Sequence, residues 1–292
     1  MWFLFAFAGA FFKSFSSFFR KKISKNVSAS VFMWISYSLF LIALAPFVII
    51  AHTPIYALLS EHLLVMIGAT VPLLLATYFN LEALKREDLS YIAPLNAFVP
   101  LFTLIIAWLF LNEAPPLIGI VGICIIIVGA YIMNLSAQKS VHWYTPLVHI
   151  FKNTGARFSL AVALSYAINS VFMKSASNAG YSSIAIIFGI SVISWLILAY
   201  VPFRSHRQVM KALQPVNFGG VISASVSSLF GSLANILAIA GTYTSYALSV
   251  RRFDMVISVL LGWKFLREGN IRYRLAGSAL MTVGVIVLVI FK

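Results

Sequence analysis

Residues 245–265, SYALSVRRFDMVISVLLGWKF, form an apolar stretch with charged residues well inside its ends. A helix of this length, at about 1.5 Å rise per residue, can cross a hydrocarbon core of about 30 Å. Arg251, Arg252 and Asp254 would then lie deep in the membrane, where ionisable groups face a protein interior or a water-filled cavity rather than lipid. The rest of the chain must therefore shelter them.

Two interpretations of these charges are open. On one continuous helix Arg251 and Asp254 share a face and can neutralise each other. Arg252 points to another face, together with Ser245 and Ser249, and its own helix offers it no carboxylate three or four positions away. An arginine so placed inside a membrane protein is a candidate anion-binding residue.

The composition indicates the class of protein. Hydrophobic residues make up 61% of the 292 residues and charged residues 10%, which is typical of a polytopic membrane protein. The net charge of +14 comes from basic residues in short connectors between apolar runs. There they meet anionic lipid head groups and fix topology, so we expect membrane lipids and no nucleic acid as partners.

The apolar runs predict an all-α protein with ten transmembrane helices. Strands of a membrane barrel would be about half as long and would alternate polar with apolar residues, which these runs do not. The predicted spans are 2–19, 29–51, 62–84, 89–111, 116–135, 157–175, 182–203, 216–240, 244–265 and 272–291.

The two halves of the chain resemble each other. The connector 136–156 separates the segments 1–135 and 157–292, each with five predicted helices. An offset of 155 residues relates many positions without a gap, among them Asn80 and Asn235, Trp108 and Trp263, and Gly129 and Gly284. Since each half has an odd number of spans, the second copy must be inverted relative to the first.

The basic residues agree with this inversion. Of the 21 Lys and Arg residues, sixteen fall on one side of the predicted membrane and two on the other. The positive-inside rule places the basic connectors in the cytoplasm and both termini outside. We expect an integral protein of the cytoplasmic (inner) membrane of a prokaryote.

Two blocks resemble the two copies of the EamA module of the drug/metabolite transporter superfamily. They are TYFNLEALKREDLSYIAPLNAFVPLFTLIIAWLFLNEAPPLIGIVGICIIIVGAYIM in the first half and YALSVRRFDMVISVLLGWKFLREGNIRYRLAGSALMTVGVIVLVI in the second. The resemblance rests on Pro94 and Pro100, the Leu-Asn-Glu ending at Glu113, the glycines of the fifth span and the segment 262–268. It implies a ten-helix secondary carrier with a central cavity, and it indicates no particular substrate.

The function expected from this resemblance and the deep charges is transport of a small anionic or zwitterionic metabolite, such as an amino acid or organic acid. Export by alternating access, with coupling to protons, is the expected mode. A flippase for a phosphate-bearing lipid is the alternative within transport, and a non-transporting membrane scaffold is the alternative outside it. The oligomeric state is left open between monomer and homodimer.

Several further residues are candidates for substrate binding or conformational change. The expected substrate contacts are Arg251, Arg252, Asp254, Asn96, Asn80, Asn235, Tyr91, Tyr246 and Lys13, and the expected hinges are Pro94 and Pro100. Prolines inside a helix free backbone carbonyls and can bend it. Asn80 and Asn235 would either join helices or reach a ligand, and the tyrosines would either anchor at the interface or gate. Lys13 would either extend to the basic side or join the deep arginines.

Other residues have a structural interpretation. Glu113 is expected to cap the helix that follows it, and Gly122, Gly129, Gly277 and Gly284 are expected to permit close helix packing. The sequence contains no phosphate-binding glycine loop with a lysine, no paired-histidine zinc motif and no nucleophile with a base. We therefore expect no enzyme activity, no cofactor and no metal.

Overall fold

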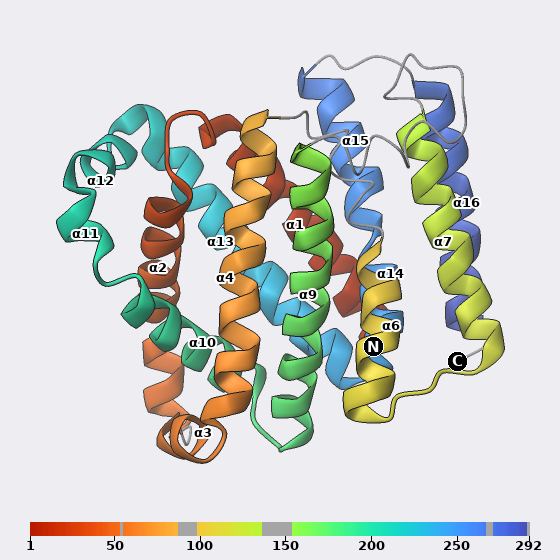
Figure 1. Cartoon of the computed structure of the whole chain (residues 1–292), viewed down its shortest axis with the longest axis horizontal. Coiled ribbons are helices and arrows are strands. Elements are labelled where there is room, and N and C mark those ends of the chain that lie inside the picture. The colour runs from red at the N-terminus through yellow and green to blue at the C-terminus, as the bar shows by residue number, and fades with distance from the viewer. Residues whose placement is uncertain (53–54, 87–97, 136–153, 267–270, 291–292) are drawn as a thin grey trace.

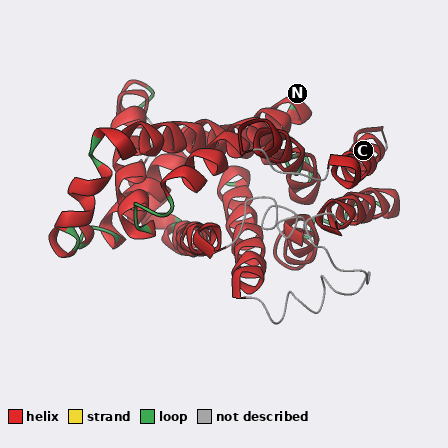
Figure 2. Ribbon diagram, turned by 90° about the horizontal axis from the view of Figure 1, so that it is seen from above, coloured by secondary structure: helices red, strands yellow, loops and turns green. Residues whose placement is uncertain are grey.

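The computed structural model describes residues 1–52, 55–86, 98–135, 154–266 and 271–290 (Figure 1). Every regular element in these ranges is a helix, and Figure 2 accordingly shows red helices and green loops. The prediction of an all-helical fold is thus confirmed for this part of the chain. The helices are α1 (Trp2–Ile23), α2 (Ala29–Ile50), α3 (Ile55–Glu61), α4 (Leu63–Arg86), α6 (Val99–Leu111), α7 (Leu117–Leu135), α9 (Thr154–Asn178), α10 (Ser183–Ile197), α11 (Val201–Arg204), α12 (His206–Ala212), α13 (Pro215–Ala240), α14 (Thr244–Val250), α15 (Phe253–Leu266) and α16 (Ile271–Ile290).

The longest helices have membrane-spanning dimensions. Among the described residues, five helical stretches are long and apolar enough to cross a bilayer: Trp2–Ile23, Ala29–Ile50, Leu63–Arg86, Ser183–Arg204 and Pro215–Ala240. Within lipid a helix satisfies its own backbone polar groups, which explains why apolar runs of this length fold as helices. The protein is therefore an integral membrane protein.

The helices pack in a pattern that repeats between the halves. α1 packs on α13 and α4 packs on α9, and these two contacts exchange under the 155-residue offset. The contact of α6 with α9 and the contact of α15 with α1 also exchange under this offset. The contacts of α2 with α10 and of α7 with α16 each join two helices that correspond to each other. In Figure 1, α4 rises toward the upper edge and its counterpart α13 descends from it. Two inverted repeats would produce this arrangement.

The contact between α7 and α16 depends on glycine. A Cβ atom at Gly129 would lie 2.8 Å from the carbonyl oxygen of Gly277, and one at Gly284 would lie 2.8 Å from that of Gly122. Both distances are too short for a real side chain, so the predicted role in close packing is confirmed for Gly129 and Gly284, while for Gly122 and Gly277 it stays a prediction. The two contacts are reciprocal, because the offset that takes Gly122 to Gly277 also takes Gly129 to Gly284.

The predicted ninth span is not one helix. It is divided into α14, which ends at Val250, and α15, which begins at Phe253, with Arg251 and Arg252 in the turn between them. The prediction of a continuous helix was therefore wrong at this point. Arg252 is buried and Arg251 is half-buried, and such residues need polar partners that a regular apolar helix does not supply. In the turn the N–H of Arg252 bonds to the carbonyl of Ser249, so the carbonyl of Leu248 can accept from the Arg252 side chain.

Basic side chains gather at one end of the bundle. Arg20, Lys21 and Lys22 end α1, and Lys85 and Arg86 end α4, both at the upper edge of Figure 1. The Nζ atom of Lys21 donates a hydrogen bond to the carbonyl of Leu84 at 2.9 Å, which ties these two helix ends together. The charge asymmetry of the sequence is thus visible in the arrangement of the helices.

Candidate functional site

A cavity lies at the centre of the helices. It has a volume of about 100 Å³, is lined by α1, α2, α4, α9, α10 and α13, and reaches the turn between α14 and α15. Since one water molecule needs about 10–15 Å³, the cavity can hold several waters or a small solute. Its wall combines apolar side chains with many polar ones, including Ser16, Ser17, Ser36, Tyr37, Thr77, Asn80, Tyr166, Asn169, Ser191, Ser228, Ser232 and Asn235.

Among the described residues, four charged side chains line this cavity: Lys13, Arg20, Arg251 and Asp254. Lys13 and Asp254 form an ion pair, with 3.2 Å between Nζ and Oδ2, and both side chains are largely buried. The Nζ atom of Lys13 also lies 4.9 Å from the centre of the Tyr166 ring, a cation–π contact. Lys13 therefore joins the deep charges instead of extending to the basic side.

The pairing of Asp254 differs from the expectation. A bond to Arg251 on a common helix face was one of the two sequence interpretations, and the structure pairs Asp254 with Lys13 of α1 instead. The break between α14 and α15 removes the regular spacing on which the expected pair depended. The Ser14 hydroxyl of α1 reinforces the contact by donating to the backbone carbonyl of Asp254 at 2.8 Å.

Two polar atoms at the turn between α14 and α15 are buried without a protein partner in the described part of the chain. Among the described residues, neither Nε of Arg251 nor Oδ1 of Asp254 has a hydrogen-bond partner, although both atoms are buried. A buried polar atom left unpaired costs about 1–3 kcal/mol, and more when it is charged. Both residues line the cavity, so these unpaired atoms lie in its wall.

Arg252 lies behind the cavity wall. Its side chain is 1% exposed and does not line the cavity, and its Nε donates to the carbonyl of Leu248 at 3.4 Å. Ser249, on the same stripe, donates to the carbonyl of Ser245 at 2.8 Å. Of the two deep arginines, Arg251 is therefore the one placed to contact a solute, whereas the sequence had favoured Arg252.

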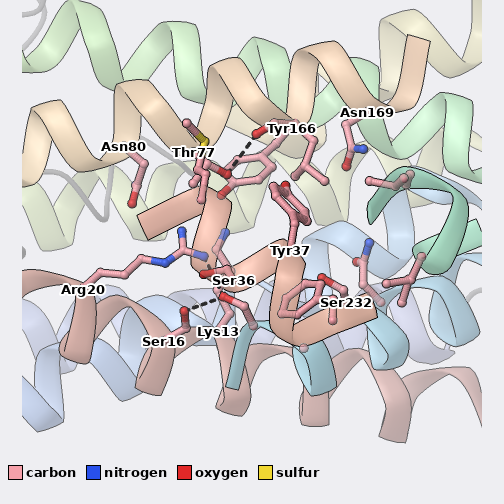
Figure 3. Close-up of a pocket in the computed structure, with 18 of the residues that line it drawn as sticks. Lys13, Ser16, Arg20, Ser36, Tyr37, Thr77, Asn80, Tyr166, Asn169 and Ser232 are labelled. Atoms are coloured by element: carbon pink, nitrogen blue, oxygen red, sulfur yellow. Dashed lines mark hydrogen bonds between the residues drawn. The ribbon is translucent and has the colours of Figure 1, made fainter. Parts of the chain in front are cut away.

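Arg20 was not expected at the site. It follows Lys13 by seven positions on α1, and Figure 3 shows both side chains extending from that helix into the cavity. Its Nη2 donates to the Ser228 hydroxyl at 2.6 Å, and its guanidinium carbon lies 5.0 Å from the centre of the Phe32 ring. Its Nε is buried without a hydrogen-bond partner among the described residues.

The spacing of polar residues along α1 could have identified the face of this helix that lines the cavity. Ser16 and Ser17 lie three and four residues after Lys13, and Arg20 lies three and four residues after them, so the four residues share one side of the helix, and all line the cavity. Arg20 was assigned to the basic end because the predicted span stopped at residue 19. The tyrosines and serines of α2, α9, α10 and α13 gave no such signal, because isolated polar residues in apolar helices have no distinctive spacing.

Asn80 and Asn235, which correspond under the offset, both line the cavity. Oδ1 of Asn235 is buried without a hydrogen-bond partner in the described part of the chain, so this atom joins no helices there, and a ligand contact of Asn235 stays a prediction. Asn169 is the residue that joins helices, since its Nδ2 donates to the carbonyl of Ala69 at 2.7 Å across the α4–α9 contact. Figure 3 shows Asn80 and Asn169 on opposite parts of the same wall.

The remaining candidates lie elsewhere. Tyr246 is completely buried against α7, where a Cβ atom at Gly119 would overlap its hydroxyl, so it is not an interfacial anchor. Pro100 is the second residue of α6, a position whose N–H needs no intrahelical partner, so it starts this helix and does not kink it. Tyr91, Pro94 and Asn96 lie outside the described residues.

A second polar cluster closes the lower end of the bundle in Figure 1, where α9, α13 and α14 approach α6. Oε2 of Glu113, just after α6, accepts a hydrogen bond at 2.7 Å from the backbone N–H of Thr244, the first residue of α14. The Nζ atom of Lys174 lies 3.8 Å from Oε1 of Glu113 and donates to the carbonyls of Ile239 and Thr242. Glu113 thus caps a helix of the other half, where the sequence suggested the next helix.

Within the ranges described, His, Cys, Asp and Glu side chains form no group of three or more that could hold a metal ion. The described residues of the cavity wall offer three cationic groups, one carboxylate and many hydroxyl and amide groups for ionic contacts and hydrogen bonds.

Comparisons with known proteins agree with these observations. The model of the EamA-like transporter family matches residues 1–135 and 153–290. No curated protein matches the chain. Among the solved structures, one described only as "Crystal structure of protein" has 13% sequence identity and a TM-score of 0.64, with 99% of this chain and 96% of that chain covered. At this identity the similarity concerns the fold alone.

Proposed function

Because the chain belongs to the EamA-like transporter family, we propose that it is a secondary transporter of a small anionic or zwitterionic metabolite, such as an amino acid or organic acid. The observation that carries this proposal is the central cavity lined by Lys13, Arg20, Arg251 and Asp254. A positively charged, partly hydrated hollow among membrane helices is suited to a solute with at least one anionic group.

We propose that the carrier consists of two inverted five-helix repeats with ten spans, and that the cavity opens alternately to either side. The exchange of helix contacts under the 155-residue offset supports this arrangement. The broken ninth span supports it too, since transporter sites commonly use discontinuous helices. Asp254 is the proposed site of proton uptake, because it is the one carboxylate among the described residues lining the cavity.

The proposed location is the inner membrane of a prokaryote, with the basic end of the bundle in the cytoplasm and the termini outside. Export is the proposed direction. The cluster of basic residues at the ends of α1 and α4 supports this orientation. Single cysteines placed at residue 22 and at residue 180, tested for labelling by an impermeant reagent in whole cells, would establish it, after the exposed native Cys124 is replaced.

Proteoliposomes test the transport proposal. Purified protein should take up or exchange a labelled solute chosen from a panel of organic acids and amino acids that raise its thermal stability. Arg251→Gln should reduce transport at least tenfold, because it removes a charged donor from the cavity wall. Arg207→Gln, at an exposed position on α12, is the matched control. Full transport by the Arg251 variant would remove this residue from the site.

The cavity also bears on the alternatives. A non-transporting scaffold would have a collapsed centre, whereas this centre contains a hollow with unpaired polar atoms on Arg251 and Asp254 among the described residues. A lipid flippase would be indicated if phospholipid head groups competed with soluble ligands for binding.

A further inference from the structure

The charges in the cavity define the kind of anion it can hold. Resting on the proposed function, we propose that the substrate is a small organic molecule with two anionic groups, one held at Lys13 and Arg251 and the other at Arg20. Such a dianion, for example a dicarboxylate, is a narrower class than the anionic or zwitterionic metabolites considered above.

The first argument is charge balance. Among the described residues, the lining has three cationic side chains and one carboxylate, which leaves two positive charges in excess. Uncompensated charge inside a membrane protein costs several kcal/mol per group, so a ligand that supplies two negative charges gives the occupied cavity its lowest energy. A monoanion would leave one cation uncompensated, and a zwitterion would leave both.

The second argument is the position of the unpaired atoms. Lys13 is paired with Asp254, whereas the adjacent Arg251 lines the cavity, its buried Nε has no partner and it forms no ion pair with a carboxylate among the described residues. Arg20 has the same feature, an unpaired buried Nε, and it forms no ion pair with a carboxylate in the described part of the chain. Each arginine therefore keeps donors for one anionic group.

The third argument is separation. Lys13 and Arg20 are seven residues apart on α1, which corresponds to about 10 Å along the helix axis. Arg20 is held at its end by Ser228, and the hydroxyls of Ser228 and Ser16 lie 2.7 Å apart beside it. One compact anion placed at the helix break would leave this second group of donors unused. Two anionic groups on one short chain would use both.

Binding to the purified full-length protein tests the proposal. The probes are succinate, glutarate and adipate, with butyrate, 4-aminobutanoate and inorganic phosphate for comparison, and Kd is measured by calorimetry at pH 7.5. We expect the best dicarboxylate to bind at least tenfold more tightly than butyrate or 4-aminobutanoate. Equal affinity for butyrate, or tighter binding of phosphate than of every dicarboxylate, would overturn the proposal.

Variants at the second subsite give an independent result. Arg20→Gln should weaken dicarboxylate binding at least tenfold and leave the Kd of butyrate within twofold, while Arg20→Lys should restore part of the loss. Arg207→Gln should change neither value. If Arg20→Gln unfolds the protein, Arg20→Lys supplies the same test at the same subsite, with a smaller loss of dicarboxylate binding and no change for butyrate. A variant that weakens butyrate and dicarboxylate equally would contradict two separate subsites.

The same proteoliposomes separate this inference from the broader proposal. Transport of dicarboxylates would support both. Transport of monoanions or amino acids with dicarboxylates excluded would overturn the dianion inference and leave a secondary transporter, and no transport of any anion would overturn both.

Discussion

The ion pair between Lys13 and Asp254 should be a major contributor to the stability of the bundle. Asp254→Asn keeps the shape of the side chain and leaves the Lys13 ammonium without its counterion. Removing one partner of a buried pair costs about 3–5 kcal/mol. The side chains of Lys13 and Asp254 are 15% and 10% exposed and face a cavity that admits water. We therefore expect the lower end, a loss of about 3 kcal/mol in the free energy of unfolding.

A double-mutant cycle measures this pair directly. Reversible unfolding by SDS in mixed micelles gives the free energies of Asp254→Asn, Lys13→Met and the double variant. Because the double variant no longer leaves the Lys13 ammonium without its counterion, it should be more stable than Asp254→Asn, with a coupling energy of about 2–3 kcal/mol. Glu61→Gln, at an exposed carboxylate, is the control and should stay within about 0.5 kcal/mol of the parent. A cost below about 1 kcal/mol for Asp254→Asn, or simple additivity, would refute the pairing.

Three further predictions concern packing and the lower cluster. Gly129→Val should lower the free energy of unfolding by about 1–3 kcal/mol, because the new side chain meets the backbone of Gly277. The control Gly219→Val, whose Cβ has no neighbouring atoms within 4 Å, should lower it by less than about 1 kcal/mol. Equal effects of the two variants would contradict the close contact between α7 and α16. Gly119→Ala should destabilise the protein through overlap with the Tyr246 hydroxyl, and adding Tyr246→Phe should restore stability in thermal unfolding; no restoration would place the overlap elsewhere. Glu113→Ala should speed amide hydrogen exchange at Thr244 at least about tenfold, because it removes a charged acceptor, while Glu61→Ala should not; unchanged exchange would mean that the cap is dispensable.

The helical fold was predictable because long apolar runs leave the backbone one solution in lipid. The packing role of Gly129 and its counterparts was predictable as well, since small residues at regular positions indicate close contact between membrane helices. The helix break at Arg251 was not, because residues 242–261 contain neither Gly nor Pro, the residues that usually mark a break in a helix. At Arg251 and Arg252, contacts with other helices determine whether the chain forms a turn or continues as a helix.

The cavity was predictable only in part. The depth of Lys13, Arg251 and Asp254 in their spans indicated a polar interior, and all three line the hollow. The ion pair between Lys13 and Asp254 joins α1 to α15, and the two residues are more than two hundred positions apart in the sequence. Residue spacing cannot predict a contact over such a separation. Arg252 was the preferred anion contact because its own helix offers it no carboxylate, an argument that considers one helix alone. Its burial depends on the other helices that pack around it.

The reciprocal glycine contacts between α7 and α16 have a consequence for how the chain could be divided. Each half contributes the same two glycines to the joint, so one half carries both complementary surfaces. In Figure 1 the two helices run antiparallel, α7 upward and α16 downward. The isolated first half, residues 1–135, could thus form this helix–helix contact only between two molecules inserted in the bilayer in opposite orientations. If all molecules inserted in the same orientation, the glycine surface of each would have no partner.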